Sequence, residues 1–240
     1  MEQRGGRLLF ESCILASDMF WQQGEHLHLG AEASVHSGNW MGISAISKQR
    51  RARSWRHPDL DDKLGRRRMI AEARLLIRLH RAGLPVPALL DLDVENKRMI
   101  IKHISGKPLI EVLREQTEVD KLMHEVGRVI RMLHRNAVTH GDLSTNNILI
   151  ETEKVHLIDF GLAAIEYDVE RFGVDLHVLH EILGASHPDH PQAMNRLLEG
   201  YLSLDEIQGP PNEGAGGKIP SAAEVVSRLD EIKTRVRYHG

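Results

Sequence analysis

Apolar and polar residues alternate along residues 25–48, which is the pattern of half-buried strands. Residues that favour turns interrupt this stretch, so we expect three short antiparallel strands. Between residues 59 and 81 the apolar residues recur at three- and four-residue steps instead, which predicts one long helix. The predicted turns are at Gly30, Gly38-Asn39 and Gly42, and the helix is predicted to end at Gly83 and Pro85.

Further along, the pattern changes from strands to helices. Ser221 with Glu224 forms a capping box for the last helix, and the Gly- and Pro-rich stretch 208–220 predicts a flexible surface loop. We expect strands at residues 88–93 and 98–104, and helices at 109–114, 119–136, 174–183, 192–202 and 222–237.

A chemical signature lies in two short stretches, HGDLSTNN at residues 140–147 and IDFG at 158–161. Asp142, in a tight loop, can accept the proton of an attacking hydroxyl, and Asn147, five residues later, can reach a metal ion. Asp159 can hold a second metal ion against nucleotide phosphates. A polar turn between two strands is the alternative, but the order and spacing are those of a protein-kinase-like phosphotransferase.

Such a site needs three more parts, and the sequence offers a candidate for each. Lys48 would be a third catalytic residue that neutralises phosphate oxygens, although surface lysines are common. Glu72, in the long helix, would pair with Lys48, unless it is a solvated glutamate near Arg68 or Lys63. A phosphate-covering turn, for which an ordinary hairpin is the alternative, comprises Gly30, Ala31, Glu32, Ala33, Ser34 and Val35.

The order of elements predicts an α+β, two-lobed, protein-kinase-like fold. Residues 1–24 are expected to form an N-terminal extension. Residues 25–104 would form a small antiparallel-sheet N-lobe with one long helix. Residues 105–240 would form a reduced helical C-lobe with a C-terminal helix and a short basic tail.

Composition limits the other classes of protein. The 240 residues suffice for one large domain or two lobes, and a net charge of −3 gives no general attraction to nucleic acid. The single cysteine, Cys13, excludes an internal disulfide, and no apolar run approaches the length of a membrane span, so we expect no membrane contact. The pairs His177/His180 and His187/His190 have metal-like spacing, but such pairs arise often among 15 histidines, and we expect no zinc site.

Two departures from a standard protein kinase are visible. Gly141 replaces the arginine that normally binds a phosphate on the activation loop. Only residues 162–174 follow the second motif before the next predicted helix. We therefore expect neither a phosphate switch nor the usual peptide platform. A basic stretch, which is either a solvated surface or a contact for acidic protein or RNA, contains Arg50, Arg51, Arg53, Arg56, Arg66, Arg67 and Arg68.

Several stretches resemble the small atypical kinase of the KEOPS/EKC complex, the PRPK family, from about Leu27 to Arg237. The resemblance implies ATP and Mg²⁺ as cofactors, with ATP hydrolysis or Ser/Thr phosphorylation that supports threonylcarbamoyl modification of tRNA adenosine. The stretches are Arg56-His57-Pro58, Leu64-Gly65-Arg66-Arg67-Arg68, Glu72-Ala73-Arg74, residues 30–35, 140–147 and 158–162, Gly173-Val174-Asp175-Leu176 and Ser186-His187-Pro188.

The resemblance also implies partners and compartments. The threonylcarbamoyl-transferase subunit would bind mainly the helical lobe and a second KEOPS subunit the N-lobe, with tRNA reached indirectly through the complex, in the cytoplasm and the nucleus. Lys102 and Ile104, in the segment that joins the lobes, would contact adenine through the backbone, although the family often has an acidic residue at Lys102. The tail after residue 234 is less arginine-rich than in the family.

Two other functions fit part of the pattern. Small-molecule phosphotransferases of the aminoglycoside or choline type also use His-Gly-Asp, but they need an acceptor pocket in an enlarged helical lobe. A non-catalytic scaffold would have no need for the complete set of Lys48, Glu72, Asp142, Asn147 and Asp159.

Overall fold

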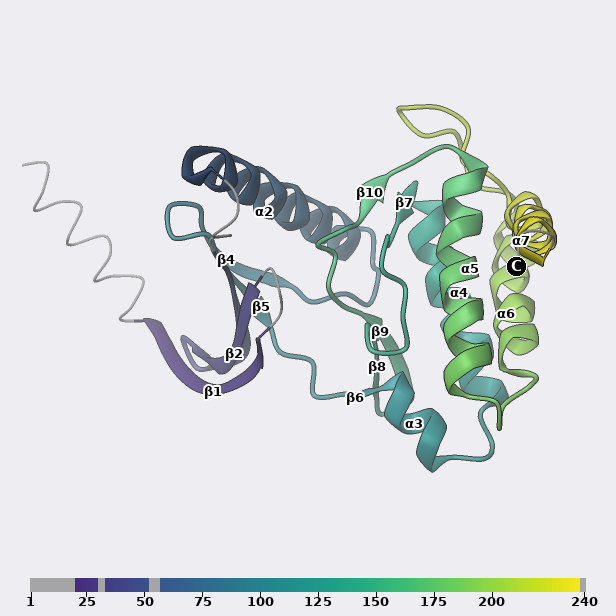
Figure 1. Ribbon diagram of the computed structural model, residues 1–240, viewed down its shortest axis with the longest axis horizontal. Coiled ribbons are helices and arrows are strands. Elements are labelled where there is room, and N and C mark those ends of the chain that lie inside the picture. Colours follow the sequence, from purple (N-terminus) through teal and green to yellow (C-terminus); the bar gives the residue numbers. More distant parts are fainter. Residues whose placement is uncertain (1–19, 30–32, 52–56, 238–240) are drawn as a thin grey trace, which may run out of the picture. The chain divides into compact units, whose positions relative to one another are not determined.

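The computed structural model describes residues 20–29, 33–51 and 57–237 (Figure 1). The chain divides into two compact units: the first runs to Arg74 and includes Ala88–His103, and the second comprises Leu75–Pro87 and the chain from Ile104 onward. The first unit is built on a sheet and the second mainly on helices, which is the predicted α+β arrangement. None of the helices in the described part combines the length and the apolar character that a bilayer crossing requires.

A five-stranded antiparallel sheet in the order β1-β2-β3-β5-β4 forms the first unit. Its register places Val35 of β2 opposite Lys48 of β3. Because β1 begins at Trp21, the end of the segment 1–24, predicted as an extension, belongs to the sheet; residues 1–19 lie outside the described part. The strands are β1 (Trp21–Leu29), β2 (Ala33–Trp40), β3 (Ile43–Arg50), β4 (Leu89–Asp93) and β5 (Arg98–Lys102).

The prediction of a turn at Gly38-Asn39 is wrong. Strand β2 runs through both residues, and the chain turns at Met41 and Gly42, whose φ angles are 51° and 86°. Gly38 makes room for a neighbour instead, because a Cβ there would lie 2.4 Å from the indole ring of Trp21. The core on this side of the sheet consists of Trp21, Ala45 and Ile100, with Trp40 and Leu90 packed against it.

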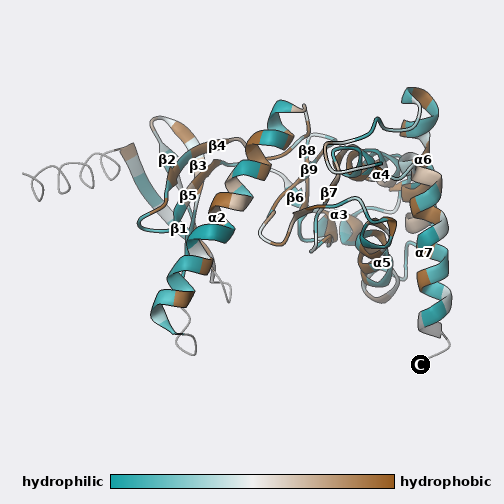
Figure 2. Cartoon of the chain, turned by 90° about the horizontal axis from the view of Figure 1, so that it is seen from above, coloured by the Kyte–Doolittle hydropathy of each residue, from teal (hydrophilic) through white to brown (hydrophobic). Residues whose placement is uncertain are grey.

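Helix α2 (Pro58–Arg81) is the long helix predicted at residues 59–81. Figure 2 shows hydrophobic bands along an otherwise hydrophilic helix, as expected for a helix that packs on one side. Two carboxylates, those of Asp61 and Glu72, lie among the buried positions. The apolar members of that buried face include Met69, Ala73, Leu76 and Leu79.

Helices α4 and α6 pack closely in the second unit. A Cβ on Gly127 would lie 1.9 Å from the Leu197 carbonyl oxygen, and a Cβ on Gly200 would lie 1.8 Å from the His124 carbonyl oxygen. The helices are α3 (Leu109–Glu115), α4 (Asp120–Arg135), α5 (Val169–Ser186), α6 (Ala193–Gln208) and α7 (Ala222–Arg237). The strands are β6 (Lys107–Pro108), β7 (Val138–Thr139), β8 (Ile148–Glu151), β9 (Lys154–Leu157) and β10 (Ala164–Ile165), paired as β6-β8-β9 and β10-β7.

Two helices of this unit are longer than predicted. Helix α5 begins at Val169 rather than at residue 174, because the Asp168 carboxylate accepts a hydrogen bond from the Glu170 N–H (3.0 Å) and caps an earlier turn. Helix α6 continues to Gln208 rather than ending at residue 202. The activation segment, which comprises residues 162–168 between the second motif and α5, is correspondingly short.

The stretch 208–220, predicted as a flexible loop, is held at several points. The Gly216 N–H donates to the Tyr167 hydroxyl (3.0 Å), and a Cβ on Gly216 would lie 2.2 Å from the Tyr167 ring. The Pro220 carbonyl accepts a hydrogen bond from Arg131 (2.9 Å). The stretch therefore packs on the activation segment and on α4.

The predicted capping box of the last helix is present. The Ser221 hydroxyl accepts from the Glu224 N–H (3.3 Å), and the Glu224 carboxylate accepts from the Ser221 N–H (2.7 Å). Bonds from Lys218 and from Ser221 lower the pKa of Glu224 to about 2.

Candidate active site

The predicted catalytic loop joins β7 to β8. The Asn147 side-chain N–H donates to the Asp142 carbonyl oxygen (2.9 Å) and to the Asp142 carboxylate (3.1 Å), so these two side chains are in direct contact. An amide that donates through Nδ2 presents Oδ1 as its remaining polar atom. The Asp142 carboxylate is exposed, which leaves it accessible to an incoming hydroxyl.

Asp159 lies at the same end of a hairpin as Asn147. Strands β8 and β9 pair Ile148 with Leu157, and the Asn147 carbonyl accepts from the Ile158 N–H (3.0 Å), which extends the pairing by one step. Asp159 is exposed and has a φ of 61°, a conformation that is uncommon for residues other than glycine. A carboxylate and an amide oxygen at one hairpin end are the hard oxygen ligands that suit Mg²⁺.

Gly141 is required by a close backbone approach. Its φ is 76°, and a Cβ there would lie 2.4 Å from the Leu162 carbonyl oxygen. The arginine of a standard protein kinase therefore has no room at this position. After Leu162, strand β10 pairs with β7 and α5 begins at Val169, so the segment that usually carries the activating phosphate is short.

A buried aspartate on α5, Asp175, holds the start of the catalytic loop. Its carboxylate accepts hydrogen bonds from the backbone N–H groups of His140 (2.5 Å) and Gly141 (2.8 Å). Burial raises the pKa of the Asp175 carboxyl, but the bonds from His134 and from these two N–H groups outweigh burial, so the pKa lies below its usual range. The two backbone positions before Asp142 are thereby fixed to a helix.

The sequence prediction had no separate role for Asp175. The only signal was an acidic residue within the apolar stretch Gly-Val-Asp-Leu of a helix, which indicates a buried carboxylate without naming its partner.

A hydrogen bond connects the two motifs of the second unit. The His140 ring donates through Nε2 to the Ile158 carbonyl (2.9 Å), next to Asp159. Phe160 is buried and its ring contacts that of His140.

The predicted ion pair of the first unit is present. Lys48 Nζ lies 2.8 Å from Glu72 Oε1, and the Glu72 side chain is 3% exposed, so Glu72 is not a solvated glutamate. Arg50, which the sequence prediction placed only in the basic stretch, lies 3.3 Å from the second oxygen, Glu72 Oε2. Residues 48 and 50 lie on the same face of β3, and that spacing of two is the signal that could have revealed Arg50.

The predicted phosphate-covering turn is only partly within the described residues. Gly30, Ala31 and Glu32 lie outside them. Ala33, Ser34 and Val35 are the first residues of β2 rather than part of a turn. Their contact with phosphate stays a prediction.

The predicted adenine-contacting segment begins where β5 ends. Lys102, the last residue of β5, is exposed, and its N–H donates to the Ala88 carbonyl (2.8 Å). Ile104 follows two residues later and is half-buried. Neither observation tests adenine binding, which stays a prediction for both residues.

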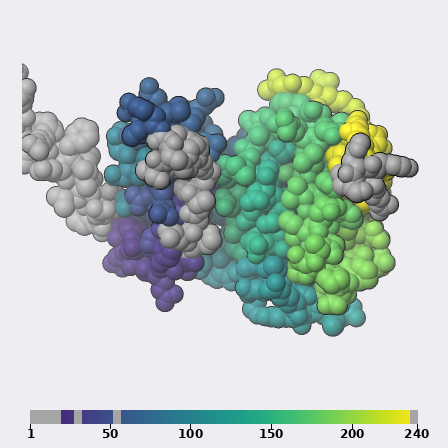
Figure 3. All heavy atoms as spheres, in the orientation of Figure 1, coloured from purple at the N-terminus to yellow at the C-terminus, as the bar shows by residue number. Residues whose placement is uncertain are grey.

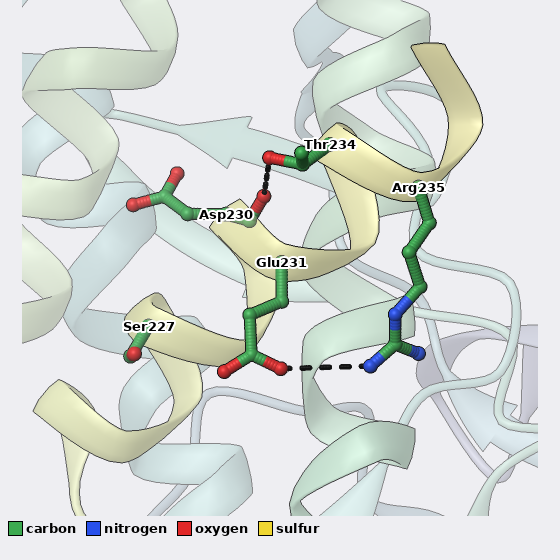
Figure 4. Close-up of a pocket in the computed structure, with 5 residues that line it drawn as sticks. All are labelled: Ser227, Asp230, Glu231, Thr234 and Arg235. Atoms are coloured by element: carbon green, nitrogen blue, oxygen red, sulfur yellow. Dashed lines mark hydrogen bonds and ion pairs between the residues drawn. The ribbon is translucent and has the colours of Figure 1, made fainter. Parts of the chain in front are cut away.

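A hollow on α7 and the histidine pairs are not part of this site. The hollow is lined by residues of a single helix (Figure 4), all of them exposed, and it contains none of the predicted site residues. The rings of His177 and His180 are 6.5 Å apart, and the described residues contain no group of three or more side chains that could hold a metal. The hollow is lined by Ser227, Asp230, Glu231, Thr234 and Arg235.

Comparisons with known proteins agree with this geometry. The RIO domain family matches residues 44–171. The KEOPS complex subunit Bud32 of Pyrococcus abyssi is 34% identical over 218 residues, which cover 87% of this chain and 94% of that protein. A probable bifunctional tRNA threonylcarbamoyladenosine biosynthesis protein of Methanosarcina acetivorans is 32% identical over 216 residues, 90% of this chain and 36% of that protein. The chain thus spans about a third of the length of the bifunctional relatives that it matches.

A solved structure confirms the predicted kinase-like fold. The Rio2 kinase-ADP/Mg²⁺-phosphoaspartate complex from Chaetomium thermophilum matches with a TM-score of 0.57 at 16% identity, covering 92% of this chain and 65% of that chain. The RIO match at residues 44–171 includes Lys48, Glu72 and both motifs of the second unit. With 34% identity across nearly the full length of Bud32, the chain belongs to the Bud32 family of RIO-domain proteins.

Proposed function

We propose that this chain is the ATP- and Mg²⁺-dependent kinase/ATPase subunit of a KEOPS/EKC-type complex that supports threonylcarbamoyladenosine formation in tRNA. The proposed ATP- and Mg²⁺-dependent activity is supported by one observation. Asn147 contacts Asp142 directly, beside the hairpin end at which Asp159 lies. The place in a KEOPS-type complex is supported by the names of the relatives, one of which is a KEOPS subunit of nearly the same length.

The five residues of the two motifs and the ion pair each have a role in this proposal. Asp142 accepts the proton of the attacking hydroxyl, from water in hydrolysis or from a Ser/Thr side chain in phosphorylation. Asn147 Oδ1 and the Asp159 carboxylate would hold Mg²⁺, which neutralises charge on the phosphates when bound. Lys48, oriented by Glu72, would bind phosphate oxygens.

The activation segment supports a site that needs no phosphate switch. Gly141 has no room for a guanidinium group, and Tyr167 is the only hydroxyl side chain in residues 162–174. The Tyr167 hydroxyl already accepts a hydrogen bond from Gly216. Phosphatase treatment should therefore leave ATP turnover unchanged.

Exposed apolar side chains support a protein partner on the second unit. Such side chains lie on the short activation segment and along α5, which forms much of the visible face of this unit in Figure 3. We assign this surface to the threonylcarbamoyl-transferase subunit. The exposed apolar residues are Leu162, Ile165, Val174 and Val178.

The first unit would bind the second KEOPS subunit, and exposed Leu27 and Ile43 of its sheet, with Met41 of the turn between β2 and β3, support that contact. The basic stretch is a weaker candidate than the sequence indicates, because Arg50 pairs with Glu72 and Arg66 pairs with Asp62 and with Glu95. Arg53 and Arg56 lie outside the described residues. Residence in the cytoplasm and the nucleus stays a prediction of the family resemblance.

The test is made in the cells from which the protein comes. The tagged chain should co-purify with a threonylcarbamoyl-transferase homologue, identified by mass spectrometry. Asp159→Ala should lower tRNA threonylcarbamoyladenosine, measured by liquid chromatography and mass spectrometry, while Asp189→Ala, at an exposed carboxylate outside the site, should not.

A free monomer, together with unchanged tRNA in the Asp159→Ala strain, would reject the KEOPS assignment. A small-molecule phosphotransferase would then be the better account. Replacement of Arg66–Arg68 in a separate strain tests the basic stretch without touching the predicted metal ligands.

A further inference from the structure

A chain of buried polar groups runs from the catalytic loop into the helical packing of the second unit. The Asp175 carboxylate, which binds the two N–H groups before Asp142, lies 3.3 Å from His134 Nε2. On the other side of the ring, His134 Nδ1 lies 2.7 Å from the Tyr201 hydroxyl. The side chains of His134 and Tyr201 are both 0% exposed, so no water replaces these bonds.

This series of buried polar groups continues to the start of α7. Arg131 Nη1 donates to the Tyr201 hydroxyl (3.3 Å), and the Arg131 guanidinium binds the Asp205 carboxylate with two bonds of 2.8 and 2.7 Å. The same carboxylate accepts from the Ala222 N–H (2.8 Å), and Arg131 also donates to the Pro220 carbonyl. Asp205 thus joins the buried chain to the first residue of α7.

Donors and acceptors along this chain match in one arrangement. Arginine can only donate, so the Tyr201 oxygen accepts from Arg131 and its O–H donates to His134 Nδ1. His134 Nε2–H then donates to Asp175. Burial lowers the pKa of His134, which agrees with a neutral ring in this tautomer, and burial raises the pKa of Tyr201, which keeps its hydroxyl protonated.

We propose that Tyr201 is a positioning residue of the phosphotransfer site, whose hydroxyl holds the His134 tautomer that anchors Asp175 and, through Asp175, the backbone before Asp142. The assignment rests on the proposed ATP-dependent activity. Tyr201 touches no reacting atom in this account. Its effect on turnover passes through the Tyr201–His134 and His134–Asp175 hydrogen bonds and then through the bonds from Asp175 to the His140 and Gly141 N–H groups.

The test is Tyr201→Phe, which removes one oxygen and keeps the ring. With the loop less well fixed, kcat for ATP turnover should fall about three- to tenfold with little change in KM, because the buried hydrogen bond that fixes the His134 tautomer is lost together with the bond from Arg131. Tyr167→Phe is the matched control, since it removes a tyrosine hydroxyl of this unit that lies outside the buried network and accepts from the Gly216 N–H. That control should keep the parental kcat.

A pH profile separates positioning from a general loss of packing. The groups that face His134 are Arg131, Asp175, His140 and Tyr201. Without the Tyr201 hydroxyl, Nδ1 loses a donor that favoured the neutral ring, so protonation of His134 becomes easier. Because the charged ring carries a proton on Nε2 in every case, the kcat deficit of Tyr201→Phe should shrink toward acid pH. A purely structural loss would lower stability and leave the same kcat deficit at every pH.

Substitution of His134 tests the same chain without touching Tyr201. Glutamine can accept from Tyr201 and donate to Asp175, as the neutral imidazole does, whereas leucine can do neither. His134→Gln should keep kcat within about threefold of the parent, and His134→Leu should lose about tenfold or more.

The possible outcomes distinguish this proposal from the proposed function. If the parent turns over ATP and Asp159→Ala does not, a parental kcat at every pH in Tyr201→Phe would overturn the positioning role alone. If Tyr201→Phe does not fold, a tenfold loss in His134→Gln overturns it instead. If parent and Asp159→Ala have equal turnover, the proposed function itself has failed.

Discussion

The ion pair of the first unit and the catalytic loop of the second are held in place by different means. Lys48 pairs with a carboxylate from α2, that of Glu72, which Arg50 also contacts. The catalytic loop is bound through its backbone to Asp175, and Asp175 belongs to a buried chain that reaches α4, α6 and α7. The loop is therefore held through its backbone by a buried network, whereas the Lys48–Glu72 pair joins two side chains.

This difference predicts a division of effects. Substitutions that disturb the pair around Lys48 should change mainly the affinity for ATP, because they displace a phosphate-binding charge. Substitutions that disturb the loop should change mainly kcat, because they displace the group that accepts the proton. The following changes test this division.

The largest effect is expected for Asp142→Asn. The amide keeps the shape and can still contact Asn147, but it cannot accept the hydroxyl proton, so phosphotransfer should fall by about two to four orders of magnitude. The melting temperature and the Kd for ATP should stay close to those of the parent. Autophosphorylation with labelled ATP is the measurement, and equal labelling of parent and variant would remove Asp142 from its role.

A smaller effect on binding is expected for Glu72→Gln. The amide no longer balances the charges of Lys48 and Arg50, so Lys48 loses its fixed position and KM for ATP should rise about ten- to a hundredfold. Glu95→Gln is the control, because Glu95 forms an exposed pair with Arg66 that contributes little. If Glu72→Gln changed only kcat, this would contradict the expectation that the Lys48–Glu72 pair affects ATP affinity and the catalytic loop affects kcat.

The buried histidine of the second unit should be visible in the pH dependence of stability. Burial lowers the pKa of His134 in the folded state, so below about pH 6.5 the unfolded chain binds a proton that the folded chain does not. The free energy of unfolding should therefore fall as pH falls from 6.5 toward the folded pKa. His134→Gln should reduce that slope by up to about 1.4 kcal/mol per pH unit in denaturant titrations.

Burial also lowers the pKa of His156 and of His187, so part of the slope should remain in the variant. A slope identical to that of the parent would mean that His134 does not stay neutral in the folded chain.

The smallest effect is expected at the exposed cap of α7. Ser221→Ala removes the hydroxyl that accepts from the Glu224 N–H and should lower the free energy of unfolding by about 1 kcal/mol. Ser227→Ala, at an exposed position of the same helix, should not destabilise the protein. If Ser221→Ala lowered the free energy of unfolding as much as the loss of a buried group would, the cap could not be treated as an exposed contact that is independent of the buried network.

Local patterns predicted much of this molecule. The spacing of apolar residues predicted α2 to within one residue, and the Ser221–Glu224 pair predicted the start of α7. The two motifs predicted that Asp142 and Asn147 would be close, because a short loop joins them. The Lys48–Glu72 pair was predicted from motif order rather than from local pattern.

Contacts between distant residues explain what the sequence could not show. Gly38 looked like a turn, but it makes room for the Trp21 ring. Arg50 looked like part of a basic surface, but it faces Glu72, which is distant in sequence. The role of Asp175 depends on a loop that precedes it by more than thirty residues, so no local pattern around α5 could reveal it.

Magnesium-dependent ATP turnover by the purified chain, compared with Asp159→Ala, tests the central claim most directly. Because Asp159 would hold a cation that stabilises transferred phosphate charge, the variant should lose about two to three orders of magnitude in turnover. Asp189→Ala, prepared in parallel to exclude contaminating ATPase, should match the parent. Equal turnover by the parent and Asp159→Ala would contradict the assignment of the site.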